Sequence, residues 1–267
     1  MNDTSAKPIA LVTGAAQGVG LGIAQVLARS GFRVILGDLD HAIATHEANQ
    51  LCHAGAEATA VLLDVSSARS WDRAVQEIEA GWGRLDLLVN NAGISPRGTP
   101  ESVDEQLWDL TLAVNLKGPW LGIKRCWQLL KATRGTIVNI GSTRATRPRR
   151  GLFVYGVSKA GLLGLTKQVA VDCLDDGLTC NMVAPGWVDT PGERRLQAKH
   201  GNPNFPAGVR NLIDPVDIGQ TVLFLTTPAG RRINGIILYV DAGLHCADDV
   251  SQIFDTPDDS ATHSSKS

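Results

Sequence analysis

The chain has 267 residues, with 25 Lys and Arg against 27 Asp and Glu and a formal net charge of −2. This near balance argues against a protein that binds nucleic acid or another polyanion through its overall charge. Apolar residues make up 43% of the chain and glycine contributes 28 residues, a composition typical of a globular α/β protein with many tight turns. It excludes the disordered, collagenous and fibrous classes.

The sequence shows no membrane, export or metal signal. No apolar run approaches the roughly 18 residues of a membrane helix, and residues 1–8 lack a basic segment followed by an apolar one. The five cysteines form an odd set without a CxxC pair, which predicts neither a disulfide framework nor a zinc cluster. We therefore expect a cytoplasmic protein with reduced thiols and no metal.

Short apolar runs alternate with helical stretches along most of the chain. The runs are continuous enough to be buried on both faces of a sheet, as parallel strands are. They predict seven strands, at residues 9–13, 33–38, 58–63, 85–90, 136–140, 179–183 and 236–240. Apolar residues at three- and four-residue spacing predict helices between them, over residues 18–30, 41–54, 68–82, about 103–133, 155–175 and 215–226.

This alternation predicts a single Rossmann-type domain. Crossovers between parallel strands are right-handed, so the economical α/β architecture is a doubly wound parallel sheet of seven strands with helices on both faces. The domain is expected over residues 8–247, after an N-terminal extension of residues 1–7. Residues 186–213, rich in Pro, Gly and charge, are predicted to form an irregular substrate lid. The acidic tail 248–267 is predicted to be disordered, with docking onto a partner subunit as the alternative.

Three glycines follow the first predicted strand and open directly into a helix. In the motif TGAAQGVG at 13–20, the spacing of Gly14, Gly18 and Gly20 suits a tight turn that lets the backbone approach a pyrophosphate. The helix N-terminus offers free N–H groups and partial positive charge to that phosphate. A glycine triplet alone is also compatible with an ordinary tight turn.

An acid at the end of the second strand strengthens the nucleotide reading. Asp38 lies close to the twenty-residue separation expected of a ribose partner. Its carboxylate would accept hydrogen bonds from the adenosine ribose and repel a 2′-phosphate, while Leu39 supplies no cation to neutralise one. The pair therefore favours NAD over NADP.

The ends of the third and fourth strands carry further candidates. Val65 is apolar enough to line an adenine pocket, and Asp64 can accept a hydrogen bond from the adenine amino group. The sequence NNAG at 90–93 combines amide side chains with two small residues, which would brace neighbouring strands and leave room for a cofactor sugar. A plain strand-to-loop turn is the alternative for this motif.

A second group of residues suggests proton transfer. Tyr155 and Lys159 lie at i and i+4, on one face of a helix. The ammonium would favour the phenolate and bring the tyrosine pKa, ordinarily about 10, toward a working range. Ser142 ends the fifth strand, where its hydroxyl can bond a substrate oxygen. Asn115, polar within an apolar helical stretch, is either a helix-bend residue or a water-holding link in a proton path.

These motifs resemble the classical short-chain dehydrogenase/reductase family, over residues 8–245. Its glycine motif matches residues 13–20, its NNAG motif residues 90–93, its Tyr-x-x-x-Lys motif Tyr155 and Lys159, and its catalytic Ser and Asn residues Ser142 and Asn115. The segment 181–190 resembles the family's Pro-Gly segment beside the nicotinamide. One departure is Ala242, which stands where the family more often has a second glycine, and puts local turn geometry in doubt.

The resemblance implies a role for each matched residue. Tyr155 would exchange a proton with the substrate oxygen, Ser142 would hold that oxygen, and Lys159 would bind the nicotinamide ribose and lower the tyrosine pKa. Asn115 and a water would connect the lysine to solvent. The backbone of Val188 and the hydroxyl of Thr190 would bind the carboxamide. The family also implies a homotetramer, with a homodimer possible, packed through residues 108–130 and 155–175.

The expected site is therefore a set of three groups. The catalytic residues are Asn115, Ser142, Tyr155 and Lys159. The cofactor-binding residues are Gly14, Gln17, Gly18, Val19, Gly20, Asp38, Leu39, Asp64, Val65, Asn91, Ala92, Gly93, Tyr155, Lys159, Pro185, Gly186, Val188 and Thr190. The substrate residues are Ser142, Arg144, Leu152, Tyr155 and Trp187, with Phe205 and Ile94 as further apolar wall candidates.

Four arginines between the catalytic serine and tyrosine have two interpretations. The stretch 143–150 stands in the loop that usually forms a pocket wall, where guanidinium groups would bind a substrate carboxylate or phosphate. Solvation at the surface, or pairing with acids of another subunit, is the other interpretation.

The sequence thus predicts an NAD-dependent oxidoreductase that interconverts a small-molecule secondary alcohol and its ketone. A cyclic or hydrophobic alcohol, a steroid, a polyol and a hydroxy acid all remain open as substrate. The alternatives are an NADP-linked carbonyl reductase of the same fold and a nucleotide-sensing binding protein without turnover. A binding protein would more naturally lack one of the four catalytic residues.

Overall fold

The computed structural model describes residues 7–199 and 212–247. The acidic tail 248–267, Phe205, most of the N-terminal extension and part of the predicted lid lie outside these residues. Within the described residues no helix has the length and apolarity needed to span a membrane.

All seven predicted strands are present and form one parallel sheet. Their order is β3-β2-β1-β4-β5-β6-β7, so the chain reverses its direction of winding between β1 and β4. Ligands bind at such a switch point, beyond the carboxyl ends of the strands. The strands are β1 (Ile9–Thr13), β2 (Arg33–Asp38), β3 (Glu57–Leu62), β4 (Leu87–Asn90), β5 (Thr136–Ile140), β6 (Thr179–Pro185) and β7 (Ile237–Val240).

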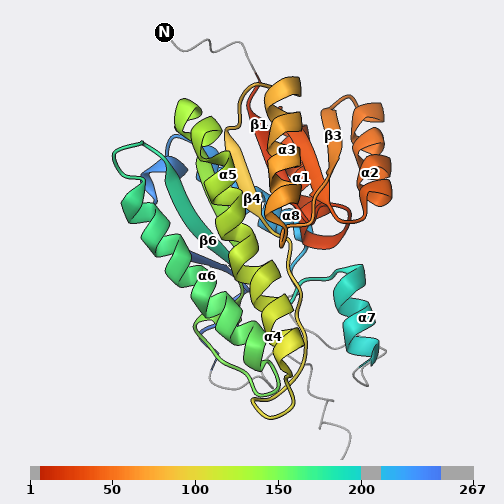
Figure 1. The fold of residues 1–267 in the computed structure, drawn as a ribbon, viewed down its shortest axis with the longest axis vertical. Helices are drawn as coiled ribbons and strands as arrows, with labels where there is room; N and C mark the ends of the chain where they lie inside the picture. Colours follow the sequence, from red (N-terminus) through yellow and green to blue (C-terminus); the bar gives the residue numbers. More distant parts are fainter. Residues whose placement is uncertain (1–6, 200–211, 248–267) are drawn as a thin grey trace, which may run out of the picture.

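Helices cover both faces of the sheet, as Figure 1 shows. One apolar cluster joins one face to α1, α2 and α8, and a second joins the other face to α3, α5 and α6. Residues along β1 alternate between the two clusters, because neighbouring side chains of a strand point to opposite faces. The long helices are α1 (Gly18–Arg29), α2 (His41–His53), α3 (Ala68–Gly81), α5 (Gly118–Thr133), α6 (Phe153–Asp172) and α8 (Pro215–Thr226).

The expected single helix over 103–133 is wrong in one respect. The structure divides it into α4 (Glu105–Leu112), a π-helical turn (Ala113–Lys117) and α5. Pro119 in the first turn of α5 has no N–H to donate to the carbonyl of Asn115, four residues earlier. The wider turn follows from this missing hydrogen bond, and it places Asn115 at the bend.

The predicted irregular lid also contains regular structure. Residues Pro191–Lys199 form α7, which stands apart from the other helices in Figure 1. The Thr190 hydroxyl accepts the backbone N–H of Glu193 at 3.0 Å and so caps the helix. Val188 pairs with Ile213 in an isolated parallel bridge, which brings the two ends of the segment together. The helix and the bridge make this part of the chain more ordered than its composition predicted.

The departure at Ala242 has a structural consequence. This alanine adopts a φ of 49°, in the left-handed region that glycine tolerates best. Three groups in the next residues, the Gly243 N–H and the backbone and ring nitrogens of His245, contact the Asp241 carboxylate and hold the turn in place. The turn that follows β7 is therefore kept despite the added methyl group.

Candidate active site

The glycine-rich loop between β1 and α1 is shaped by close backbone contacts. A Cβ at Gly14 would lie 2.8 Å from the Cα of Ala92, and a Cβ at Gly20 would overlap the Gly14 carbonyl. Gly14 and Gly18 both have positive φ, 65° and 61°. Gln17 precedes α1 without a side-chain cap on the first turn. The cradle that these residues leave, at an uncapped helix N-terminus, fits the pyrophosphate of a dinucleotide.

Asn91 and Thr13 hold the glycine turn against the end of β4. The Asn91 amide donates to the carbonyls of Thr13 and Gly14 at 2.8 and 3.0 Å, and the Thr13 hydroxyl accepts the N–H groups of Asn91 and Ala92. Asn90 donates to Asn139 of β5 at 2.8 Å. The predicted bracing role of the amide motif is confirmed, whereas the contribution of Thr13 was missed, because a threonine at a strand end carries no distinctive pattern.

Asp38 lies at the end of β2 beside the glycine loop. One of its carboxylate oxygens accepts the Ala16 N–H and the other the Asp40 N–H, each at 2.9 Å. Leu39 beside it is 70% exposed. The acid therefore stands at the loop, as the spacing predicted, and also ties that loop to β2.

The remaining candidates for cofactor binding lie after β3, at Asp64 and Val65, and in or beside the glycine loop, at Gln17 and Thr190. Val65 is buried, and its carbonyl accepts the indole N–H of Trp71. Asp64 accepts both the backbone N–H and the hydroxyl of Ser66 through one carboxylate oxygen. In the glycine loop, the Cβ that Gly18 lacks would lie 3.4 Å from the Thr190 methyl carbon, and Arg195 of α7 donates to the Gln17 side chain at 2.9 Å.

Three of the four catalytic candidates, Ser142, Tyr155 and Lys159, line one cavity of about 260 Å³. Ser142 comes from the turn after β5, whereas Tyr155 and Lys159 come from α6. The Tyr155 side chain makes a hydrogen bond with that of Ser142. Trp187 lines the same cavity, together with residues of the cofactor set, namely Val19, Asn91, Gly93, Pro185, Gly186, Val188 and Thr190.

Lys159 is buried beneath the tyrosine. Its ammonium donates to the Ile140 carbonyl at 2.8 Å and lies 5.8 Å from the centre of the Tyr155 ring. Burial lowers the pKa of Lys159 to about 8, because a desolvated ammonium is costly. The Cβ that Gly93 lacks would lie 3.3 Å from the Asn115 Oδ1 and 3.7 Å from the Lys159 Nζ. Asn115 and Lys159 therefore border the same space.

Asn115 fixes the loop after β4. Its amide oxygen accepts the Ile94 N–H, and its amide nitrogen donates to the Ile94 carbonyl and to the Ser158 hydroxyl. Ser158 was not among the predicted residues. Its spacing from Asn115 gives no signal, because the two helices that carry them pack together only in the folded chain.

The neighbours of Tyr155 shift the pKa of its phenol in opposite directions. Burial raises the pKa of its phenol, and the Ser142 hydrogen bond is the largest influence that lowers it. Glu193 of α7 raises this pKa further, whereas Arg144 and Arg97 lower it. The net shift of the Tyr155 pKa is upward, contrary to the lowering expected from Lys159, and the two arginines act in that expected direction instead. Neither Arg97 nor Glu193 was predicted, since both stand outside the motifs.

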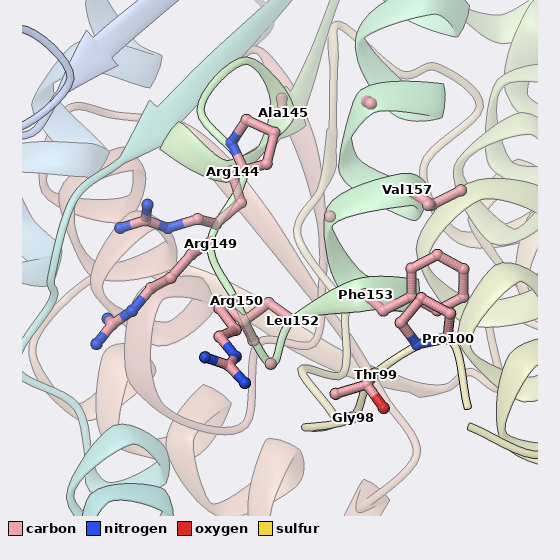
Figure 2. Close-up of a pocket in the computed structure, with 14 residues that line it drawn as sticks. Gly98, Thr99, Pro100, Arg144, Ala145, Arg149, Arg150, Leu152, Phe153 and Val157 are labelled. Carbon is pink, nitrogen blue, oxygen red and sulfur yellow. The ribbon is translucent and has the colours of Figure 1, made fainter. Parts of the chain in front are cut away.

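Two of the predicted substrate residues lie in another cavity. Arg144 and Leu152 line a space of about 610 Å³, between the loop near Gly98 and the start of α6 (Figure 2). Leu152 is buried and pairs with Gly98 in an isolated bridge. Ser142, Tyr155 and Trp187 of the substrate set line the catalytic cavity, and so does the wall candidate Ile94.

Comparison with known proteins decides the family. A family model described as enoyl-(acyl carrier protein) reductase matches residues 14–245. The chain belongs to the classical short-chain dehydrogenase/reductase family. It is accordingly an oxidoreductase of the alcohol dehydrogenase type, and members of this family use a nicotinamide cofactor.

Two named relatives in this dehydrogenase/reductase family act on ring alcohols. Trans-4-hydroxycyclohexanecarboxylate dehydrogenase of Sinomonas cyclohexanicum is 35% identical, with 91% of this chain and 95% of the relative covered. The 2,5-dichloro-2,5-cyclohexadiene-1,4-diol dehydrogenase LinX of Sphingobium indicum is 33% identical, with 91% and 98% covered. A crystal structure of an actinorhodin polyketide ketoreductase variant with NADPH is 28% identical and has a TM-score of 0.84, with 90% and 98% covered.

Proposed function

We propose that this chain is an NAD-dependent dehydrogenase that interconverts a secondary alcohol and its ketone. One observation carries the proposal. The hydrogen-bonded pair of Ser142 and Tyr155 shares a single cavity with the buried Lys159 and with Val19 and Thr190 of the cofactor side. A phenol, a hydroxyl and an ammonium beside a dinucleotide cradle suit proton transfer at a carbon that exchanges a hydride.

Each of the four catalytic candidates has a defined task in the proposed reaction. The Ser142 hydroxyl binds the substrate oxygen, and Tyr155 takes the proton from that oxygen or returns it. Lys159 binds the nicotinamide ribose and favours the phenolate. Asn115, with a water at its freed carbonyl, links the lysine to solvent. The bound nicotinamide supplies the hydride exchange.

The preference for NAD rests on the end of β2. An adenosine 2′-phosphate beside the Asp38 carboxylate would bring two negative charges together, and the exposed Leu39 offers no compensating cation. An NADP-linked reductase is the second candidate, because a similar structure contains NADPH. A nucleotide sensor without turnover is disfavoured, because such a protein would more naturally lack one of the four residues that match the family's catalytic set.

A ring alcohol is the substrate class that we favour. The relatives named above act on substituted cyclohexane and cyclohexadiene alcohols. Trp187 and Ile94 give the catalytic cavity an apolar wall, which suits a carbocycle better than a polyol.

Assembly into a homotetramer, or a homodimer, is a further part of the proposal. Leu110 and Trp120, on α4 and α5, are 51% and 42% exposed. A cavity of about 560 Å³ lies beside them and is lined by Leu112, Leu116 and Leu165. Apolar surface of this kind suits contact with a second copy. Light scattering after gel filtration measures the mass; a monomer at micromolar concentration would contradict this part.

A substrate screen with both nicotinamide cofactors tests the function. Cyclic alcohols, polyols, hydroxy acids and steroids are incubated with NAD or NADP, and the reduced cofactor is followed by its absorbance. We expect NAD-linked oxidation of ring alcohols. Tyr155→Phe should bind NAD with unchanged affinity and lose several orders of magnitude of turnover, because it lacks the proton-transferring hydroxyl. Full activity of Tyr155→Phe would refute the mechanism.

A further inference from the structure

Three arginines from two separate segments lie close enough to shift one another's pKa, and two of them, Arg144 and Arg149, line the cavity of about 610 Å³. Arg97 lies in the loop after β4, and Arg144 and Arg149 lie in the connection between β5 and α6. The Arg149 guanidinium sits over the Trp187 ring, 5.7 Å from its centre. Figure 2 shows the side chains of Arg144 and Arg149 extending in the same direction, away from Phe153 and Val157. Arg149 thereby connects the cavity of about 610 Å³, which it lines, to Trp187 of the catalytic cavity.

These positive charges repel one another. Burial is the main cause that lowers the pKa of Arg144 and of Arg149, and the neighbouring arginines lower both further. Arg97 lowers the pKa of Arg144, of Arg149 and of the Tyr155 phenol. The cluster is therefore within electrostatic reach of the reacting group.

Acidic partners for the cluster are lacking in the described part of the chain. None of the ion pairs within residues 7–199 and 212–247 includes Arg97, Arg144 or Arg149. Glu193 raises the pKa of Arg149 but forms no ion pair with it among the described residues. The Arg144 guanidinium donates to the Arg147 carbonyl at 3.3 Å, which is a neutral acceptor. Cations that are partly withdrawn from water and have no acidic partner are costly to keep together unless an anion joins them.

We propose that Arg144 and Arg149, with Arg97 beside them, bind an anionic group of the substrate, a carboxylate or a phosphate remote from the reacting alcohol. This assignment rests on the proposed function and specifies its substrate further. Guanidinium groups match both anions with paired N–H donors. Trp187 lines the catalytic cavity and contacts Arg149, so its ring joins the reacting end of the cavity to the charged end.

Binding of matched probes to the NAD-saturated protein tests the proposal without requiring turnover. Calorimetry compares cyclohexanecarboxylate, cyclohexyl phosphate and the uncharged cyclohexanecarboxamide, at low and at high salt. We expect one of the anions to bind at least about tenfold more tightly than the carboxamide, since hydrogen bonds between charged groups are the stronger kind. The better of the two anions identifies the natural group. High salt should reduce the preference.

Variants within the same connection provide the control. Arg149→Gln and Arg144→Gln should each reduce the preference for the anion about tenfold. Arg147→Gln removes the same charge from the same segment, but its guanidinium donates to the Leu244 carbonyl at 2.8 Å. We expect Arg147→Gln to keep the preference within about twofold.

Equal binding of the anions and the carboxamide would overturn the proposal. So would an equal loss of preference in Arg147→Gln and Arg149→Gln, which would reduce the effect to net charge. A change of oligomeric state in the arginine variants, without a change of preference, would assign the cluster to acids of a second copy instead.

Turnover separates this inference from the proposed function. Oxidation of cyclohexanol at the same rate constant, kcat/KM, as 4-hydroxycyclohexanecarboxylate would overturn the anion site and leave the dehydrogenase standing. Binding that depends on the anion and on Arg149, without turnover of any alcohol, would support the anion site and refute the proposed function.

Discussion

The cofactor side and the substrate side of the cavity are built in different ways. On the cofactor side, backbone atoms approach so closely that no side chain fits at Gly14 or Gly20, and amide groups tie the loop to β4. On the substrate side, long charged side chains from three segments meet, with Arg97, Arg149 and Glu193 as examples. The first surface is fixed by the chain itself, whereas the second changes with individual side chains.

The two sides of the cavity meet different requirements of the reaction. A pyrophosphate and a ribose are constant ligands, so a rigid cradle of backbone N–H groups suits them. A substrate differs between related enzymes, and it is recognised by side chains that can be exchanged without disturbing the sheet. Lys159 lies at the boundary of the two regions. Its burial lowers its pKa to about 8 and therefore opposes folding, while it suits the role that we propose for this lysine.

Replacement of this lysine should produce the largest effect. In Lys159→Met we expect turnover to fall by several orders of magnitude, because the ammonium that we propose to bind the nicotinamide ribose and to favour the phenolate is lost. The unfolding free energy at pH 7 should nevertheless rise by about 1–3 kcal/mol, since the pKa of the buried ammonium is lowered to about 8 and its charge opposes folding. The lost hydrogen bond to the Ile140 carbonyl offsets part of this gain.

The difference in unfolding free energy between Lys159→Met and the wild type should depend on pH. Between about pH 8 and the unfolded value of 10.5, the unfolded chain holds more protons on Lys159 than the folded chain, so wild-type stability rises with pH. The advantage of Lys159→Met should therefore be full below pH 8 and shrink toward pH 10. Urea unfolding of both proteins without cofactor measures it. An advantage that is constant from pH 7 to pH 10 would contradict a buried ammonium.

A methyl group on the cofactor side should have the next largest effect. Gly20→Ala places its Cβ against the Gly14 carbonyl, so we expect a loss of about 1–3 kcal/mol in unfolding free energy and a large loss of NAD affinity. Gly81→Ala, at the end of α3, meets no atom within 4 Å and should be neutral or stabilising by up to about 1 kcal/mol. Thermal unfolding and NAD titration compare the two. Similar behaviour of both variants would show that the loop is looser than its contacts imply.

The same division explains what the sequence could predict. The seven strands were placed to within about two residues, because a parallel strand buried on both faces is a continuous apolar run. The glycines, Asp38, Asn91 and the pair of Tyr155 and Lys159 stand in motifs with fixed spacing, and the structure places them around the cleft. The π turn at Asn115 was missed although Pro119 signals it, because apolar periodicity continues through the turn.

The substrate side was harder to predict. Arg97 and Glu193 belong to no motif and reach Tyr155 only through tertiary packing. Arg144 and Leu152 were expected to line the same cavity as Ser142 and Tyr155, yet they line the cavity of about 610 Å³ instead. Sequence order does not say to which side of a loop a side chain extends. Helix α7 was hidden for a related reason, since its Pro and Gly at the start resemble a loop.

The smallest expected effect lies at Asp38 and concerns selectivity alone. Asp38→Asn removes the charge and keeps an oxygen that can accept the Ala16 N–H, so the glycine loop should remain in place. We expect the ratio of kcat/KM for NAD to that for NADP to fall about tenfold to a hundredfold, because the repulsion of the 2′-phosphate is lost. Asp38→Ala loses the loop contact as well and should further weaken the binding of both cofactors. If Asp38→Asn leaves the ratio unchanged while Asp38→Ala lowers the affinity for NAD and NADP equally, the carboxylate only supports the loop and the choice of cofactor is made elsewhere.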